Sequence, residues 1–96
     1  MAAYVISEVE ILDHEHIDTY RALAAESITQ FGGRYLVRGG ASELVEGGPS
    51  PKTFVIVEFP TMAAAPNWYA SPAYAAALTV RQKALDRRLV FVEGVA

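Results

Sequence analysis

The sequence predicts one α+β domain that spans residues 1–96 and has the element order βαββαβ. Three observations support this fold class. Several segments alternate between apolar and polar residues, as half-buried strands do. Other segments carry helix start signals followed by helical periodicity. The chain is 52% hydrophobic and 20% charged over 96 residues, which suffices for one core but not for two domains.

The first elements are a strand and a well-marked helix. Residues 3–11 alternate in the manner of a strand. Asp13 is a good N-cap, and Glu15 in the first turn favours the helix dipole. Gly32 and Gly33 end the helix, because glycine adopts the left-handed conformation at little cost. Between these signals runs one stripe of mostly apolar residues: Ile17, Tyr20, Leu23, Ala24, Ser27, Ile28 and Phe31.

Two further strands follow, separated by a turn. Residues 34–39 predict the second strand, whose terminal glycine pair suggests a bulge after which the strand resumes at 42–45. Residues 46–51 are a cluster of turn-forming residues. The third strand is expected over 52–59.

The remaining elements are two helical segments and a strand. A helix is expected over 62–70, in which Pro66 predicts a kink or a short first turn. Ser71, followed by proline, starts a second helical segment that runs to about residue 85. Residues 88–93 predict the last strand. This order is the ferredoxin-like one, an antiparallel sheet with its helices on one face.

Composition argues against several classes of protein. The net charge is −3, whereas nucleic-acid binders usually carry a basic patch. No apolar run approaches the roughly 20 residues of a membrane span, and the N-terminus lacks a basic n-region. The charge and the lack of a long apolar run lead us to expect a protein that binds neither nucleic acid nor membrane. With no cysteine, the chain has no disulfide framework, so we also expect it to be cytoplasmic. Four neighbouring basic residues are interpreted as one solvated helix end: Arg81, Lys83, Arg87 and Arg88.

The parity of the strands predicts a homodimer. One set of positions holds mostly small β-branched residues, suited to packing under helices: Val5, Ser7, Val9, Tyr35, Val37, Val55, Val57, Val90 and Val92. The opposite set mixes large apolar groups with charges: Tyr4, Ile6, Glu8, Arg34, Leu36, Arg38, Phe54, Ile56, Glu58, Leu89, Phe91 and Glu93. If this second set faced water, it would expose a large apolar patch, which monomers rarely do. If it were an ordinary core, it would bury charged side chains, which is costly unless they are paired. A face that meets the sheet of a second copy and encloses a polar-lined cavity avoids both problems.

Four features together resemble a known family. They are Gly32-Gly-Arg-Tyr-Leu-Val-Arg-Gly-Gly40, Val57-Glu-Phe-Pro60, Trp68-Tyr-Ala-Ser-Pro-Ala-Tyr74 and Arg81. The combination is similar to the family called domain of unknown function 1330 (DUF1330), and the resemblance runs from Tyr4 to Gly94. It implies a dimeric α+β barrel, in which two ferredoxin-like sheets close into one barrel with pockets between sheet and helices. That group includes cofactor-free monooxygenases, haem-degrading enzymes, muconolactone isomerase and chlorite-dismutase-like proteins.

Charged residues of the second set are the first candidates for chemistry. Arg34 and Arg38 lie four apart on one strand, so both are expected to point the same way and could clamp an anion. They could instead pair with Glu8 and Glu58 on neighbouring strands. Glu58 in an apolar pocket could act as a general base, and the alternative is a salt bridge to Arg38. Glu58 and Arg38 are therefore the candidate catalytic residues.

Aromatic residues are the main candidates for ligand binding. Trp68, Tyr69 and Tyr74 lie close together in the sequence, and rings with polar handles often wall a ligand site. They are at least as often core or interface anchors. Together with Tyr4 and Arg34, they make up the predicted substrate-binding set.

Two functional hypotheses follow. In the first, a cofactor-free enzyme or binder holds a small anionic or aromatic ligand between sheet and helices. Its pocket would be lined by Tyr4, Arg34, Arg38, Glu58 and Trp68. In the second, a non-catalytic dimeric module uses the same charges as interface ion pairs. No metal site is expected, because the only histidines, His14 and His16, are two apart and do not share a helix face.

Overall fold

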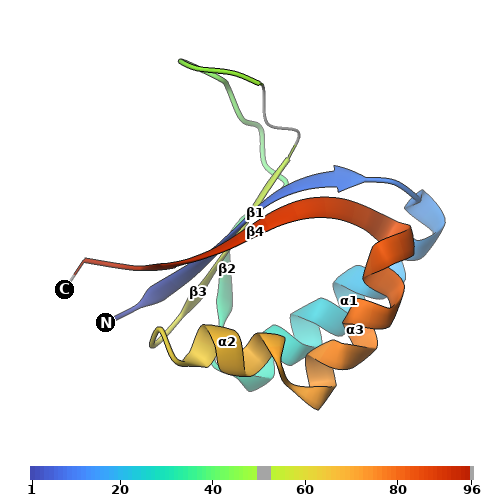
Figure 1. Cartoon of the computed structure of the whole chain (residues 1–96). Coiled ribbons are helices and arrows are strands. Elements are labelled where there is room, and N and C mark those ends of the chain that lie inside the picture. Colours follow the sequence, from blue (N-terminus) through green and yellow to red (C-terminus); the bar gives the residue numbers. More distant parts are fainter. Residues whose placement is uncertain (50–52, 96) are drawn as a thin grey trace.

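The computed structural model describes residues 1–49 and 53–95, and it has a ferredoxin-like α+β fold (Figure 1). Its elements follow the predicted order, including the two helical segments expected after the third strand: β1 (Ala3–Ile11), α1 (His14–Gln30), β2 (Arg34–Arg38), β3 (Phe54–Phe59), α2 (Ala64–Tyr69), α3 (Pro72–Ala84) and β4 (Leu85–Glu93). The four strands form one antiparallel sheet in the order β2-β3-β1-β4. The helices lie together on one side of this sheet (Figure 1). No helix of the described residues is long and apolar enough to span a membrane.

Side-chain caps start the two long helices where the sequence predicts them. Asp13 accepts a hydrogen bond from the Glu15 amide (Oδ1···N 2.8 Å) at the start of α1. Ser71 accepts one from the Tyr74 amide (Oγ···N 3.1 Å), with Pro72 at the first position of α3. Gly32 follows α1 with a φ of +76°, a conformation that L side chains rarely adopt.

Other boundaries differ from the predicted ones. Residues 42–45 form no strand, and the predicted first residue of β3, Lys52, lies outside the described residues. Pro66 occupies the first turn of the short helix α2. Backbone N–H groups in a first turn have no carbonyl partner within the helix, so proline at this position removes no helical hydrogen bond. The strand β4 begins at Leu85, three residues earlier than predicted, directly after α3.

The pairing of β4 corrects the predicted faces. Phe91 lies opposite Val5 and Leu89 lies opposite Ser7, two residues of β1 that are buried under the helices. Leu89 and Phe91 therefore belong to the inner face, the sheet face that packs against the helices. Val90 and Val92 point the other way and are 39% and 42% exposed. The prediction had these four residues reversed, because it placed small residues under the helices.

A bulge in β2 corrects a second prediction. Tyr35 pairs with Val57, but Val37 pairs with Ile56 and Arg38 with Val55, so the register shifts between Tyr35 and Val37. One extra residue moves everything after it to the other side of the sheet. Arg34 and Arg38 therefore lie on opposite faces, and the expectation that both point the same way is wrong. The bulge precedes the glycine pair at which it was expected.

The outer face, opposite to the helices, keeps the mixed character that the sequence analysis assigned to one face. Its members follow from the pairings: Tyr4, Ile6, Glu8, Glu10, Arg34, Val37, Phe54, Ile56, Glu58, Asp86, Arg88, Val90 and Val92. Arg34 pairs with Glu58 (Nε···Oε1 2.8 Å), and Arg88 lies 3.7 Å from Glu8. The expected salt bridge from Glu58 to Arg38 is not formed, because the two residues lie on different faces.

Candidate functional site

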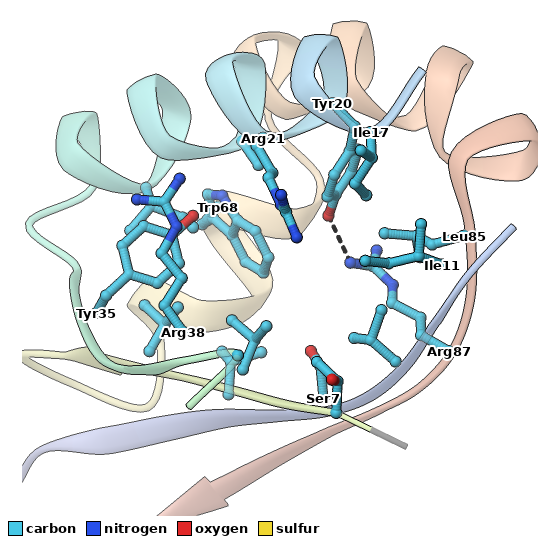
Figure 2. A pocket seen from close by; sticks show the side chains of 18 residues that line it. Ser7, Ile11, Ile17, Tyr20, Arg21, Tyr35, Arg38, Trp68, Leu85 and Arg87 are labelled. Atoms are coloured by element: carbon cyan, nitrogen blue, oxygen red, sulfur yellow. Dashed lines mark hydrogen bonds between the residues drawn. The ribbon is translucent and has the colours of Figure 1, made fainter. Parts of the chain in front are cut away.

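A cavity of about 410 Å³ lies between the inner face of the sheet and helix α1 (Figure 2). Most of its wall is apolar, contributed mainly by the sheet strands, α1 and α2: Val5, Val9, Ile28, Val55, Val57 and Trp68. Its polar lining comes mainly from tyrosines and arginines: Tyr20, Arg21, Tyr35, Arg38 and Arg87, with Ser7 on the floor. The site therefore joins an apolar body to a few polar groups, as small-molecule sites commonly do.

Tyr20, Tyr74 and Arg87 form a cluster at one end of the cavity, named here the phenol–guanidinium cluster. Arg87 donates from Nη1 to the Tyr20 hydroxyl and from Nη2 to the Tyr74 hydroxyl, each at 2.6 Å. The two hydroxyl oxygens are also 2.6 Å apart. Burial raises the pKa of the Tyr74 hydroxyl well above its ordinary range, and the neighbouring Tyr20 adds to this. Helix α1 thus meets α3 and β4, two consecutive elements from the other end of the chain, at one point.

Arg38 and Tyr35 border the opposite end of the cavity (Figure 2). The Arg38 guanidinium lies over the Tyr35 ring, 4.5 Å from its centroid, a cation–π contact. Burial raises the pKa of the Tyr35 hydroxyl, and the nearby Arg38 charge opposes this effect. Arg21 reaches down from α1 between the two ends (Figure 2).

The cavity lining has positive charge without a matching negative charge. Of its 18 described lining residues, three are arginines and none is a carboxylate. Arg21 lies 3.9 Å from Asp18, whose side chain is 86% exposed, so this contact neutralises it weakly. Arg87 is half-buried, and no ion pair to it occurs among the described residues. The electrostatics of the cavity therefore favour a negatively charged guest.

Trp68 forms a rigid part of the wall. Its ring is 2% exposed and packs against the rings of Phe59 and Tyr74, with centroids 5.5 and 4.2 Å away. Its indole Nε1–H donates to the Ser27 hydroxyl (3.0 Å), which in turn donates to the Ala24 carbonyl (2.8 Å). This chain of hydrogen bonds fixes the ring against α1.

The structure divides the predicted site residues between the two sheet faces. Arg38 and Trp68 line the cavity, and Tyr74 lies behind it in the phenol–guanidinium cluster. Tyr69 is 39% exposed and packs on the rings of Trp68, Tyr74 and Phe91 without lining the cavity. Three others lie on the outer face, away from the cavity: Tyr4, Arg34 and Glu58.

Sequence reasoning missed Arg87, Arg21 and the polar role of Tyr20. Arg87 is not part of a solvated helix end: it lies in β4 and pairs with Val9 on the inner face. Its position could have been found from the alternation of Leu85, Arg87 and Leu89, had the strand been extended back to its true start. Tyr20 was assigned to the apolar stripe of α1. Helical periodicity does not indicate that its hydroxyl contacts Tyr74 and Arg87.

One group of possible metal ligands lies outside the cavity, at the start of α1. Asp13, Glu15 and His16 bring one ligand atom each within 4.8 Å of one another. Both Asp13 oxygens already have local partners, the Glu15 amide and His16 Nδ1 at 2.6 Å. The hydrogen bond to His16, helped by the Glu15 amide, lowers the pKa of Asp13. Helix capping therefore accounts for this cluster.

Comparison with known proteins supports the resemblance drawn from the motifs. The family model described as "Domain of unknown function (DUF1330)" matches residues 2–95, nearly the whole chain. No curated protein matches the sequence.

Several solved structures share the fold. The RPA0582 protein of unknown function from Rhodopseudomonas palustris is 23% identical, with a TM-score of 0.78 over 99% of this chain and 83% of that one. SnoaB, a cofactor-independent oxygenase from Streptomyces nogalater, is 10% identical, with a TM-score of 0.62 over 99% and 94%. A dimeric protein of unknown function with a ferredoxin-like fold from Bacteroides fragilis is 13% identical, with a TM-score of 0.57 over 97% and 96%. At these identities the likeness extends to the fold.

Proposed function

The chain belongs to the DUF1330 family, and from this premise we propose that it is a homodimer that binds a small organic anion in the cavity between sheet and helices. The observation that carries the proposal is the lining of the cavity, with three guanidinium groups and no carboxylate among its described residues. A guanidinium binds carboxylates and other oxyanions in a bidentate manner. Arg21 and Arg38 are exposed, whereas Arg87 is half-buried and has no ion-pair partner among the described residues, so a bound anion would offset the cost of burying its charge.

The size and walls of the cavity define the rest of the ligand. At about 30 Å³ per water-sized group, a volume of about 410 Å³ holds roughly a dozen non-hydrogen atoms. The apolar part of the lining is aliphatic apart from the rings of Trp68, Tyr20 and Tyr35, so it favours an aromatic or short aliphatic body. An aromatic carboxylate or phenolate of one ring fits both criteria.

The outer face supports the homodimer. Its exposed valines, Val90 and Val92, continue into the half-buried apolar side chains of Ile6 and Ile56. Monomers seldom leave an apolar sheet face uncovered. One structural neighbour is itself described as dimeric. A second copy that packs sheet against sheet would cover this face and leave the cavity, which lies on the other side, open to ligand.

The proposal holds for an enzyme or for a non-catalytic binding protein, and a structural module without a ligand is the competing hypothesis. A cofactor-free reaction on the bound anion would require the cavity to hold a substrate, as the proposal states. A purely structural module would instead have no ligand, and its arginines would serve only packing or association.

Calorimetric titration with benzoate and with its neutral analogue benzamide tests the proposal. We expect benzoate to bind and benzamide to bind at least about fivefold more weakly. Arg38→Gln should weaken benzoate binding about fivefold, because it removes one guanidinium from the cavity. Arg34→Gln, on the same strand but on the outer face, is the matched control and should leave benzoate affinity unchanged. Equal affinity for benzoate and benzamide, or no binding of either, would contradict anion binding.

A further inference from the structure

The phenol–guanidinium cluster has one more donor proton than it can use. Arg87 donates one N–H to each phenol oxygen, and the two hydroxyls share a single hydrogen bond. Four protons lie between these groups, the two N–H protons that Arg87 directs at the hydroxyls and the two hydroxyl protons, and the arrangement uses three of them. One hydroxyl proton therefore has no acceptor within the cluster.

The position of the two rings indicates which hydroxyl holds the spare proton. Tyr74 is fully buried and does not line the cavity, whereas Tyr20 does line it. If Tyr20 donated to Tyr74, the proton of Tyr74 would be left inside the core, where an unmade hydrogen bond is costly. If Tyr74 donates to Tyr20, the remaining proton, on Tyr20, can point into the cavity. Burial favours the protonated form of Tyr74, which suits a donor.

The charge of Arg87 adds a second, independent reason to expect a ligand atom here. Its partners among the described residues are two neutral hydroxyls rather than a carboxylate. Its neighbour in sequence, Arg88, points to the outer face and lies near Glu8. The Tyr20–Arg87 end of the cavity thus presents a free O–H beside a guanidinium that no carboxylate of the described residues neutralises.

We propose that this end of the cavity is an oxyanion subsite that binds the single ionised oxygen of a phenolate or enolate. The inference rests on the proposed function, because it names the ligand group that this end of the same cavity takes. Tyr20 donates a hydrogen bond from its hydroxyl to the ligand oxygen and keeps its proton. Arg87 supplies the compensating positive charge, and Tyr74 holds the Tyr20 hydroxyl in position. The single free donor, the Tyr20 hydroxyl, matches a ligand with one ionised oxygen, whereas a carboxylate would present two oxygens. On binding of a phenol, its own proton leaves to water.

The binding of 4-nitrophenol tests this subsite, because its absorbance spectrum distinguishes the phenol from the phenolate. The experiment adds wild-type protein to 4-nitrophenol at a pH below the pKa of the free phenol. We expect the bound molecule to show the phenolate spectrum, with its pKa lowered by at least about one unit, a tenfold preference for the ion. Tyr20→Phe should weaken phenolate binding about tenfold and abolish the spectral shift. Arg88→Gln, one residue from Arg87 but on the other face, is the matched control and should leave the shift intact.

The outcomes separate this inference from the proposed function. If benzoate binds but 4-nitrophenol binds as the neutral phenol or not at all, the oxyanion subsite is overturned and anion binding stands. If neither benzoate nor 4-nitrophenol binds, both proposals fall. A shift that persists in Tyr20→Phe also overturns the assignment. Should Tyr20→Phe not fold, Arg87→Lys keeps the charge but not the two-pronged donor geometry, and it should reduce the shift without abolishing benzoate binding.

Discussion

Arg34 and Arg38 lie four residues apart on one strand, yet they point to opposite faces of the sheet. The bulge between Tyr35 and Val37 separates them. It leaves Arg34 paired with Glu58 on the outer face and brings Arg38 to the border of the cavity. The same strand thus serves the surface proposed for dimerisation and the site proposed for ligand binding, and the two arginines become matched probes of those roles.

Removal of the Tyr74 hydroxyl should destabilise the protein. In Tyr74→Phe, Arg87 and Tyr20 each lose a hydrogen-bond partner in a half-buried place, so we expect the free energy of unfolding to fall by about 1–3 kcal/mol. Tyr69→Phe is the control, since this ring is 39% exposed, and should cost less than about 0.5 kcal/mol. Urea denaturation measures both. An equal effect of the two substitutions would contradict the described role of the cluster.

Alkaline pH should weaken the folded state through the same tyrosine. An unfolded tyrosine ionises near pH 10, and burial raises the pKa of Tyr74 in the folded protein. The stability from this group is therefore fully present below about pH 10 and is lost as the pH rises above it, because only the unfolded chain releases the proton there. Unfolding free energies measured from pH 8 to pH 11 should fall less steeply in Tyr74→Phe than in wild type. Parallel curves would show that Tyr74 does not contribute to this pH dependence.

Ser27 should support the cavity wall by holding Trp68. In Ser27→Ala, the indole N–H loses its acceptor in a fully buried place, so we expect a loss of about 1–3 kcal/mol and a change in tryptophan fluorescence. Thr29→Ala removes a similar hydroxyl from the exposed side of the same helix, where its bond to Ala25 is solvent-accessible. That control should have a small effect. A fluorescence spectrum unchanged by Ser27→Ala would argue against this anchor.

A charge on the outer face should prevent association. In Val90→Asp, a carboxylate replaces an exposed apolar side chain that lies beside Ile6 on the proposed sheet-to-sheet contact, so we expect a monomer in sedimentation equilibrium where wild type is a dimer. Val95→Asp is the control, because Val95 is 99% exposed beyond the end of β4, and it should remain dimeric. A wild-type monomer, or a Val90→Asp dimer, would contradict the proposed interface.

Much of the fold could be predicted from local chemistry. The caps Asp13 and Ser71 and the alternation of β1 are signals carried by adjacent residues, and the structure confirms them. Pro66 lies in the first turn of α2, which begins at Ala64 rather than at the predicted residue 62.

The errors concern features that depend on pairing between distant segments. The bulge in β2 is set by the register with β3, and no glycine or proline marks the place. The face of β4 was predicted from side-chain size, but Phe91 packs under the helices against Tyr69. Size gave the wrong answer because the register with β1 sets which face each β4 residue takes, whatever its volume.

The candidate site could be predicted only in part for the same reason. Arg38 and Trp68 were singled out from the sequence and do line the cavity, although the argument placed Arg38 on the wrong face. Arg87 meets Tyr20 and Tyr74 across 67 and 13 residues of sequence. Such a contact follows from the packing of three elements and has no local signature.

The central claim is that the cavity binds a small organic anion, and a crystal of the wild-type protein grown with 4-bromobenzoate tests it most directly. The anomalous signal of bromine locates the ligand without reference to the protein's own density. We predict one bromine peak per chain between the inner face and α1, with the ligand carboxylate within hydrogen-bond distance of a cavity guanidinium, that of Arg21, Arg38 or Arg87. An empty cavity, or a ligand found only on the outer face beside Arg34 or Arg88, would contradict the proposal.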